Sequence, residues 1–307
     1  MGGDCLNYGC VPSKALIKSA KIVHQMKNGE HYGLDKREPR FSFRKVMERV
    51  HNVIAKVEPH DSVERYTDLG VEVLQGYATV IDPWTVNISL NDGGKVRLTS
   101  RAIIVAAGAE PFVPALPGIE ESGFLTSDTL WQELADHDEV PEKLVILGGG
   151  PIGCELAQSF ARLGSTVLQI QRGNRIMVRE DEDVSLFAKE SLEKDGVQVL
   201  TDHSALRCER DGAAKYIVVE HEGLEKRIEY DVLICAVGRS ARLKGYGLEK
   251  LGIPTERTIV TNEYLETIYP NILCAGDVAG PYQFTHTAAH QAWYAAVNGL
   301  FGEWKRF

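Results

Sequence analysis

The chain has 307 residues, of which 44% are hydrophobic and 25% are charged, and its formal net charge is −9. These proportions are ordinary for a soluble globular protein with one or two domains. The acidic balance argues against nucleic acid as a main partner. No run of about 18 apolar residues occurs, so the sequence predicts no membrane span, and the first residues have neither the basic nor the apolar region of a signal peptide.

Six cysteines are spread over the chain, at positions 5, 10, 154, 208, 235 and 274. They are too sparse for a disulfide scaffold in a protein of this size. This usage favours a reducing, cytoplasmic compartment. A close pair of cysteines in such a compartment is more often catalytic than structural.

The strongest chemical signal lies at the start of the chain, where Cys5 and Cys10 have glycines on both sides and precede a Pro-Ser-Lys sequence. Pro12 suits the first turn of a helix, and the run that follows has helical character. The pair is therefore expected at a helix N-terminus, where the dipole and the free amides favour a thiolate. A disulfide at this place would be redox-labile.

Two other interpretations of this pair remain, namely two unrelated thiols or half of a zinc site. A structural zinc site needs about four ligands. No second Cys/His pair with ligand spacing occurs in the sequence. We therefore favour a redox pair and predict no metal site.

The sequence Gly-Gly-x-Cys-(x)4-Cys-x-Pro-Ser-Lys resembles, residue for residue, the redox-active disulfide motif of the pyridine nucleotide-disulfide oxidoreductases. This family includes dihydrolipoamide dehydrogenase, glutathione reductase and mercuric reductase. The resemblance implies that Cys10 is the thiolate that faces the flavin and that Cys5 is the interchange thiol. It also implies that Lys14 and Glu155 form an ion pair near the flavin N5, although by itself Lys14 would be read as a surface lysine of a helix.

Residues 41–70 are expected to form a second helix, because apolar residues recur at steps of three and four. Short strands are predicted over four ranges, with a hairpin turn at residues 91–94. These ranges are 71–74, 76–81, 85–90 and 95–98.

A buried strand is predicted at residues 102–106, and it ends in small residues that allow another backbone or a ligand to come close. The resemblance makes this the motif that closes the FAD domain, with Ala107 in place of the usual Thr and Gly108 after it. Without the resemblance, it would be a buried strand before a linker, and prolines between residues 111 and 117 mark that linker.

An apolar strand at residues 143–147 runs into a G-x-G-x-x-G sequence, followed by a helix at 155–163 and a strand at 165–170. The glycines of that sequence are Gly148, Gly150 and Gly153. Strand, glycines, helix and strand in this order predict a dinucleotide-binding βαβ unit, with the helix N-terminus facing the phosphates. The alternative is a glycine-rich turn in some other α/β protein.

The end of the second strand of this unit bears on the choice of nucleotide. An acidic residue there would hydrogen-bond the ribose of NAD, but Gln171 and Arg172 stand at this point, and further arginines follow at 175 and 179. Guanidinium groups without an acid favour a 2′-phosphate, so the sequence predicts NADPH over NADH. A solvated loop of charged residues is the alternative.

The rest of this part is predicted to contain a helix at 184–194 and strands at 197–200, 215–221 and 226–230. A buried strand at 231–237 then ends at Gly238. By resemblance, Gly238 belongs to the Gly-Arg motif where the chain leaves the NAD(P) domain. The family usually continues with Pro-Asn, where this chain has Ser240 and Ala241.

The last part of the chain resembles the second FAD motif of the family at Gly276 and Asp277. In that motif the carboxylate binds a ribityl hydroxyl of the flavin. Phe284, Thr285 and His286 open a helix whose N-terminus would face the flavin ring. His286 and His290 are four residues apart, but as metal ligands they lack a third partner.

The resemblance implies an α/β fold of tandem Rossmann-like FAD- and NAD(P)-binding domains in three layers, with the FAD domain truncated. We expect residues 1–115 and 243–307 to form the truncated FAD-binding domain with the redox-disulfide helix. Residues 116–242 are expected to form the NAD(P)-binding domain. By this resemblance, we expect the chain as given to lack the family's upstream FAD-binding βαβ unit and its C-terminal interface domain.

The implied function is that of an FAD-dependent NAD(P)H:disulfide oxidoreductase, in which a hydride passes from NADPH (or NADH) through the flavin to the Cys5–Cys10 disulfide. The expected substrate is a small molecule or a thiol/disulfide compound, and the full-length family forms homodimers. Residues 280–287 resemble the mercuric reductase-like branch. The alternative is a nucleotide-binding fragment without turnover, and the chain as given is expected to bind little flavin and to lack dithiol reductase activity.

Overall fold

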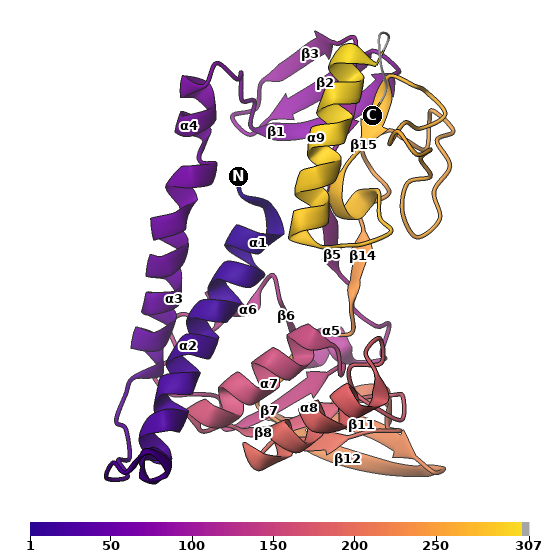
Figure 1. The fold of residues 1–307 in the computed structure, drawn as a ribbon. Coiled ribbons are helices and arrows are strands. Elements are labelled where there is room, and N and C mark those ends of the chain that lie inside the picture. The colour runs from indigo at the N-terminus through magenta and orange to yellow at the C-terminus, as the bar shows by residue number, and fades with distance from the viewer. Residues whose placement is uncertain (303–306) are drawn as a thin grey trace. The chain divides into compact units, whose positions relative to one another are not determined.

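The computed structural model describes residues 1–302 and 307, so residues 303–306 of the predicted FAD segment lie outside the described part. The chain forms two compact units (Figure 1). The larger unit comprises residues 2–60 and 111–238, and the smaller unit comprises Met1, residues 61–110 and residues 239–307. No helix in the described part is long and apolar enough to cross a membrane.

A parallel sheet of five strands, in the order β6-β13-β7-β8-β9, forms the centre of the larger unit. Its strands are β6 (Leu125–Thr126), β7 (Lys143–Leu147), β8 (Thr166–Ile170), β9 (Gln198–Leu200) and β13 (Val232–Cys235). Helix α7 (Pro151–Leu163) connects β7 to β8, and α8 (Glu182–Lys194) connects β8 to β9. The predicted strand–helix–strand unit is thus present, and Gly164 ends α7 in the left-handed conformation.

The second sheet of this unit is antiparallel, with the order β10-β11-β12. Its strands are β10 (Ser204–Asp211), β11 (Ala214–His221) and β12 (Leu224–Tyr230). The sequence predicted the last two strands and missed β10. Only Cys208 of β10 is buried, so this edge strand shows no clear alternation of apolar and polar residues.

Alternate residues of β7 face two different cores, which gives the predicted three layers. Leu144 and Ile146 pack with the residues of α7, whereas Val145 and Leu147 pack with residues of the antiparallel sheet. This alternation follows from the two-residue period of a strand. Helices, a parallel sheet and an antiparallel sheet therefore lie one upon another in the larger unit.

Two long helices, α2 (Cys10–Lys27) and α3 (Phe43–Val57), pack on each other, and α2 packs on α7 (Figure 1). The rings of Phe43 and Phe160 lie 6.0 Å apart. The first sixty residues therefore pack with the parallel sheet, whereas the sequence had grouped residues 1–115 with 243–307. Which cofactor each segment serves stays a prediction.

Three short helices complete the described part of this unit, α1 (Gly3–Asn7), α5 (Ile119–Ser122) and α6 (Leu130–Glu133), together with a 3-10 turn, η1 (Gly29–Tyr32).

The single helix expected over residues 41–70 is broken. Helix α3 ends at Val57, a 3-10 turn, η2, covers Glu58–Asp61, and α4 covers Val63–Asp68. Pro59 explains the break, because it has no N–H to donate and its ring disturbs the preceding turn. The strand expected at residues 71–74 is also wrong, because these residues are irregular in the structure.

The smaller unit contains an antiparallel sheet of β1 (Gly76–Asp82), β2 (Thr85–Leu90) and β3 (Lys95–Thr99), as predicted. Strand β4 (Ile103–Val105) pairs in parallel with β15 (Ile272–Cys274), although the two are far apart in the sequence. Strand β5 (Ala109–Pro111) pairs with β14 (Arg239–Ala241). Helix α9 (Thr285–Phe301) packs against β4, β15 and the 3-10 turn η3 (Gly276–Val278).

Candidate functional site

The glycine sequence lies where β7 ends and α7 begins. Gly148 has a φ of 109°, and a Cβ there would collide with the carbonyl oxygen of Ala236 on the neighbouring strand. A Cβ at Gly153 would collide with the carbonyl oxygen of Gly148, so the first turn of α7 lies directly against the glycine loop. A Cβ at Gly150 would meet nothing within 4 Å. The loop is therefore tight on its inner side and open at the helix N-terminus, which fits a dinucleotide pyrophosphate.

Two glutamines of the β8 region hold this loop in place. The Gln171 side-chain oxygen accepts a hydrogen bond of 2.9 Å from the Gly149 N–H. The fully buried Gln169 amide donates one of 2.9 Å to the Gly148 carbonyl oxygen. The sequence identified Gln171 as a nucleotide residue, but it gave no sign that Gln169 points toward the loop.

The arginines after β8 differ in their surroundings. Arg175 donates hydrogen bonds to the carbonyl oxygens of Glu180 and Val178, at 2.7 and 3.3 Å, so it braces its own loop. Arg172 and Arg179 are exposed and make no hydrogen bond or ion pair with the described residues.

The loop after β9 supports this segment, since the backbone N–H of His203 donates to the Gln171 carbonyl oxygen at 3.1 Å. Gly238 follows β13, whose neighbour β7 leads into the glycine loop.

The structure places the two N-terminal cysteines on either side of a tight turn. Cys5 lies in α1, Cys10 is the first residue of α2, and both are free thiols in the structure. The Gly9 N–H donates to the Asp4 carbonyl oxygen at 2.7 Å, and a Cβ at Gly9 would lie 3.6 Å from the Cα of Cys5. Cys10 is exposed and Cys5 is half-buried, so an external thiol or electrophile can reach this pair.

A buried tryptophan, which the sequence did not single out, anchors this turn. The indole N–H of Trp131, on α6, donates a hydrogen bond of 2.8 Å to the carbonyl oxygen of Tyr8. Leu6 is also buried in this region. The chain between the cysteines is therefore fixed from two sides.

The other four cysteines are poor candidates for redox chemistry. Burial raises the pKa of the Cys154 and Cys208 thiols, and it raises the pKa of Cys235 and Cys274 to about 12. A thiol that stays protonated is a weak nucleophile. Of the six cysteines, Cys5 and Cys10 are thus the remaining candidates for redox chemistry.

The structure also brings together Lys14 and Glu155, which are 141 residues apart in the sequence. The Lys14 ammonium lies 2.6 and 2.7 Å from the two carboxylate oxygens. Their side chains are 59% and 39% exposed, so the pair contributes about 1 kcal/mol or less to stability. The pair shows that the N-terminal part of α2 lies beside the N-terminal part of α7.

A second polar contact lies near the opposite ends of these two helices. Asp195, which follows α8, lies 3.1 Å from the His24 ring nitrogen of α2 and 2.9 Å from the Arg162 guanidinium of α7. With the Lys14–Glu155 pair, this contact shows that α2 and α7 run in the same direction. Cys10 and the glycine loop therefore lie at the same end of the larger unit. Both positive ends of the helix dipoles are found there.

In the smaller unit, the predicted flavin residues leave the same edge of a parallel strand pair. Val105 of β4 is opposite Cys274 of β15, and the Ala275 N–H donates to the Val105 carbonyl oxygen at 3.0 Å. The segments that follow these two strands are Ala107–Gly108 and Gly276–Asp277. Carboxyl edges of parallel strands are the usual place for ligands in α/β folds.

Asp277 has an unusual environment for a carboxylate. It is half-buried, and its side chain makes no hydrogen bond or ion pair with the described residues. Burial raises its pKa, and the positive charge of Arg239 partly opposes this rise. A carboxylate in this state suits a ligand whose hydroxyl groups donate hydrogen bonds to it, such as the ribityl chain of a flavin.

Gln291 of α9, which the sequence did not identify, holds the turn that carries Asp277. Its oxygen accepts from the Gly276 N–H at 2.9 Å, and its nitrogen donates to the Gly280 carbonyl oxygen at 2.6 Å. Phe284 and Thr285 stand at the start of α9, and the rings of Phe284 and His286 stack with their centroids 5.5 Å apart.

Among the described residues, no group of three or more His, Cys, Asp or Glu side chains could hold a metal ion.

The family model for pyridine nucleotide-disulphide oxidoreductases matches residues 1–292 of the chain. The chain belongs to this family. The resemblance found in the N-terminal motif is therefore confirmed over most of the chain's length. The α/β fold with its parallel sheet is confirmed as well.

Several members of this family are similar over nearly the whole chain. A mercuric reductase of Staphylococcus aureus is 31% identical over 302 residues, which cover 98% of this chain and 54% of that protein. A dihydrolipoyl dehydrogenase of Bacillus subtilis is 32% identical over 303 residues, which cover 97% of this chain and 64% of that protein. The chain thus spans about half to two-thirds of the length of these relatives.

A solved structure is also similar, that of the HOCl-induced flavoprotein disulfide reductase RclA from Escherichia coli, determined as a Cu(II) complex. It has a TM-score of 0.81 and 27% identity, and the match covers 99% of this chain and 64% of that chain. The fold of the oxidoreductase family therefore extends through both units.

Replacing Asp277 with Asn is expected to stabilise the flavin-free chain at about pH 7, because the amide has no charge to desolvate. The raised pKa means that the folded state binds the carboxyl proton more tightly than the unfolded state. The free-energy cost of burying the ionised Asp277 carboxylate is therefore present at neutral pH. It decreases as the pH falls through the pKa of the folded state, and it is gone below the pKa of the unfolded state. Thermal unfolding should show a higher Tm for the variant at about pH 7, with a difference that shrinks toward about pH 4.

The control is Asp68→Asn, which changes an exposed carboxylate of the same unit and should leave the Tm unchanged. An Asp277→Asn variant that is less stable than the wild type at neutral pH would contradict this description of Asp277.

Proposed function

We propose that the chain provides the nucleotide site and the redox dithiol of an FAD-dependent NAD(P)H:disulfide oxidoreductase. The observation that carries this proposal is the parallel packing of α2 and α7, because it puts Cys10 and the glycine loop at one end of the larger unit. A site that receives a reduced nicotinamide and a dithiol that can be reduced are both needed for this chemistry.

The proposed overall step is balanced in electrons and protons. NADPH, a proton and the Cys5–Cys10 disulfide give NADP⁺ and two thiols, so the nicotinamide loses a hydride and the S–S bond breaks. FAD, when bound, supplies the means of accepting a hydride and delivering two electrons to a disulfide. The dithiol then passes its two electrons to an acceptor by thiol–disulfide exchange or by direct reduction.

The chain's own residues have separate parts in this proposal. Cys10, at the N-terminus of α2, would hold the thiolate nearest the flavin, and the half-buried Cys5 would exchange with the substrate. Lys14, held by Glu155, would place a positive charge where reduced flavin accumulates negative charge. In the smaller unit, Asp277 would accept a hydrogen bond from the flavin's ribityl chain.

The remaining predicted residues would contact the cofactors through their backbone or their rings. Gly148, Gly150, Gly153 and Gly238 would surround the dinucleotide. Ala107, Gly108 and Gly276 would let the flavin approach the strand ends closely. Phe284, Thr285 and His286 would present the start of α9 to the flavin ring.

We further propose that NADPH is the preferred nucleotide. Gln171 replaces the acidic residue that would bind a ribose 2′-hydroxyl, and its side chain is already engaged by the Gly149 N–H. Arg175 is occupied by backbone carbonyl oxygens, which leaves Arg172 and Arg179 as the exposed cations of this loop. A 2′-phosphate would give Arg172 the anionic partner that no described residue provides.

A second candidate function is nucleotide binding without turnover. The observation in its favour is that the glycine loop lies wholly in the larger unit, whereas Asp277 and α9 belong to the smaller unit. Nucleotide binding therefore does not require the flavin residues. The first proposal also includes an acceptor, which would be a disulfide, a thiol or another small molecule. It further includes a homodimer and a cytoplasmic location.

The proposed electron transfer can be tested by labelling the thiols. The oxidised chain is mixed with FAD under anaerobic conditions, NADPH is added, and iodoacetamide adducts are located by mass spectrometry. The proposed electron transfer predicts adducts at Cys5 and Cys10 only where NADPH and FAD are both bound, while the other four cysteines stay unlabelled. Cys10→Ser, which cannot form the disulfide, should label at Cys5 without NADPH. Bound NADPH and FAD that leave both thiols protected would instead support nucleotide binding without turnover.

The choice of nucleotide is tested by Arg172→Gln. The loss of a charge-assisted contact to the 2′-phosphate should weaken NADPH binding about tenfold and leave NADH binding almost unchanged. Lys194→Gln, at an exposed cation of α8, is the matched control and should affect neither nucleotide. NADH bound by the wild type as tightly as NADPH would contradict the proposed preference.

A further inference from the structure

The carbonyl oxygen of Tyr8 lies between the two N-terminal cysteines and belongs to neither of the helices around it. Helix α1 ends at Asn7, and the hydrogen bonds of α2 begin at the Gly9 carbonyl oxygen, which accepts from the Ser13 N–H at 3.1 Å. A backbone carbonyl at such a helix end needs a partner from outside the helix. The indole N–H of Trp131 is that partner, at 2.8 Å and 123 positions farther along the chain.

The indole that donates this hydrogen bond is fixed in the core of the larger unit. Trp131 is 3% exposed, and it shares one hydrophobic core with Leu130 and Leu134 beside it and with Phe160 of α7. A buried indole N–H is a donor only and needs an acceptor. The hydrogen bond to Tyr8 therefore satisfies both groups, and it attaches the turn between the cysteines to a close-packed core.

Backbone contacts close this turn on the side of Cys5. The Tyr8 and Gly9 N–H groups both donate to the Asp4 carbonyl oxygen, at 2.9 and 2.7 Å. Gly9 directly precedes Cys10, and a Cβ on it would lie 3.6 Å from the Cα of Cys5. The backbone next to Cys10 therefore lies against the backbone of Cys5, as a disulfide requires, since its two Cα atoms lie within about 7 Å of each other.

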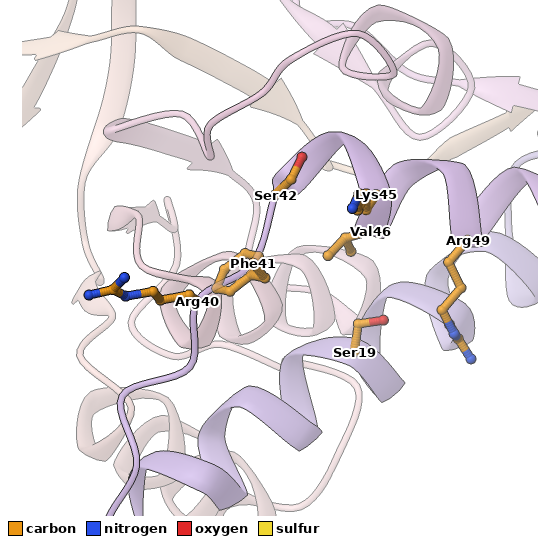
Figure 2. A pocket seen from close by; sticks show the side chains of 7 residues that line it. All are labelled: Ser19, Arg40, Phe41, Ser42, Lys45, Val46 and Arg49. Atoms are coloured by element: carbon orange, nitrogen blue, oxygen red, sulfur yellow. The ribbon is translucent and has the colours of Figure 1, made fainter.

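The other end of the turn enters α2, and α3 holds this helix in place. Arg49 of α3, shown in Figure 2, donates a hydrogen bond of 2.8 Å to the Ala15 carbonyl oxygen of α2. Leu16 of α2 and Met47 of α3 are completely buried in the same core. Cys10 thus begins a fixed helix, and the position of Cys5 relative to it depends on the turn that Trp131 holds.

We propose that Trp131 is a positioning residue of the redox dithiol, and that its hydrogen bond to Tyr8 favours the Cys5–Cys10 disulfide. The inference rests on the proposed function, because it takes the two thiols to be a redox pair. A turn that is already fixed in the dithiol loses less conformational entropy when the S–S bond closes. The dithiol is thereby a stronger reductant. Trp131 acts through the turn and takes no part in the electron transfer itself.

The test is a redox titration of the chain in glutathione buffers, without nucleotide or flavin. Two thiols and one glutathione disulfide give the Cys5–Cys10 disulfide and two molecules of reduced glutathione, so two electrons and two protons pass to glutathione. Alkylation with iodoacetamide and mass spectrometry give the fraction of thiol. Trp131→Phe keeps an aromatic ring and loses the donor, so it should shift the equilibrium about fivefold toward the thiols, the effect of one lost hydrogen bond.

Two control variants separate positioning from general stability. Leu130→Ala removes packing from the same core and keeps the indole N–H, so it should lower the Tm and leave the thiol–disulfide equilibrium unchanged. Trp84→Phe, at an exposed indole of the smaller unit, should change neither quantity.

The indole N–H signals in a ¹H–¹⁵N NMR spectrum are a second readout that needs only the wild-type dithiol and disulfide. The signal of Trp131 is identified by elimination, with Trp84→Phe, Trp293→Phe and Trp304→Phe. It should change position when the disulfide is reduced, because its acceptor lies between the two cysteines. The signals of the exposed Trp84 and Trp293 should stay where they are.

The inference is overturned if Trp131→Phe leaves the equilibrium unchanged or shifts it toward the disulfide. It is also overturned if Leu130→Ala has the same effect as Trp131→Phe, or if the Trp131 signal does not respond to reduction. In these cases the disulfide still forms and the proposed function stands. A wild-type chain whose Cys5 and Cys10 form no disulfide in any glutathione buffer would contradict the proposed function, and this inference with it.

Discussion

The arrangement of the larger unit depends on the packing of α2 along α7. Leu16 and Ala20 of α2 and Phe160 of α7 are completely buried in one shared core. Burial of a large apolar side chain contributes about 1.5–3 kcal/mol. Apolar contact holds the two helices together. Their common direction is seen from two polar contacts, that of Lys14 with Glu155 near one end and that of Asp195 with both helices near the other.

This constraint gathers the chemistry of the larger unit at one end. Cys10 begins α2 and the glycine loop begins α7, so a redox-active thiol and a phosphate-binding loop both lie at positive helix ends.

Much of the local structure could be predicted from the sequence, because local signals determine it. The strand and glycines before α7 and the left-handed Gly164 after it identify the βαβ unit, and the hairpin between β2 and β3 follows from its Asn-Asp-Gly-Gly turn. A helix N-terminus at the cysteine pair was also predicted, from Pro12 and the run that follows it, and Cys10 is the first residue of α2, whereas Cys5 lies in the separate helix α1. Each of these features depends on residues within about one element of each other.

The features that the sequence could not show arise from contacts between distant segments. The grouping of residues 2–60 with the parallel sheet depends on the α2–α7 interface, where the partners are more than a hundred residues apart in the chain. Gln169 and Gln291 hold the two loops of interest, but a buried glutamine looks in the sequence like any polar residue. The resemblance to a family, and not the spacing of residues, predicted the Lys14–Glu155 pair that marks this interface.

The central claim is that the dithiol helix and the nucleotide helix form one cooperative unit. Amide hydrogen exchange tests it most directly, by comparing residues 16–23 of α2 with residues 156–163 of α7. The account predicts equal opening free energies for the two helices, and NADPH at 100 times its Kd should slow exchange in both by about a hundredfold. The claim is contradicted if α2 exchanges by a separate opening of lower free energy and NADPH protects α7 alone.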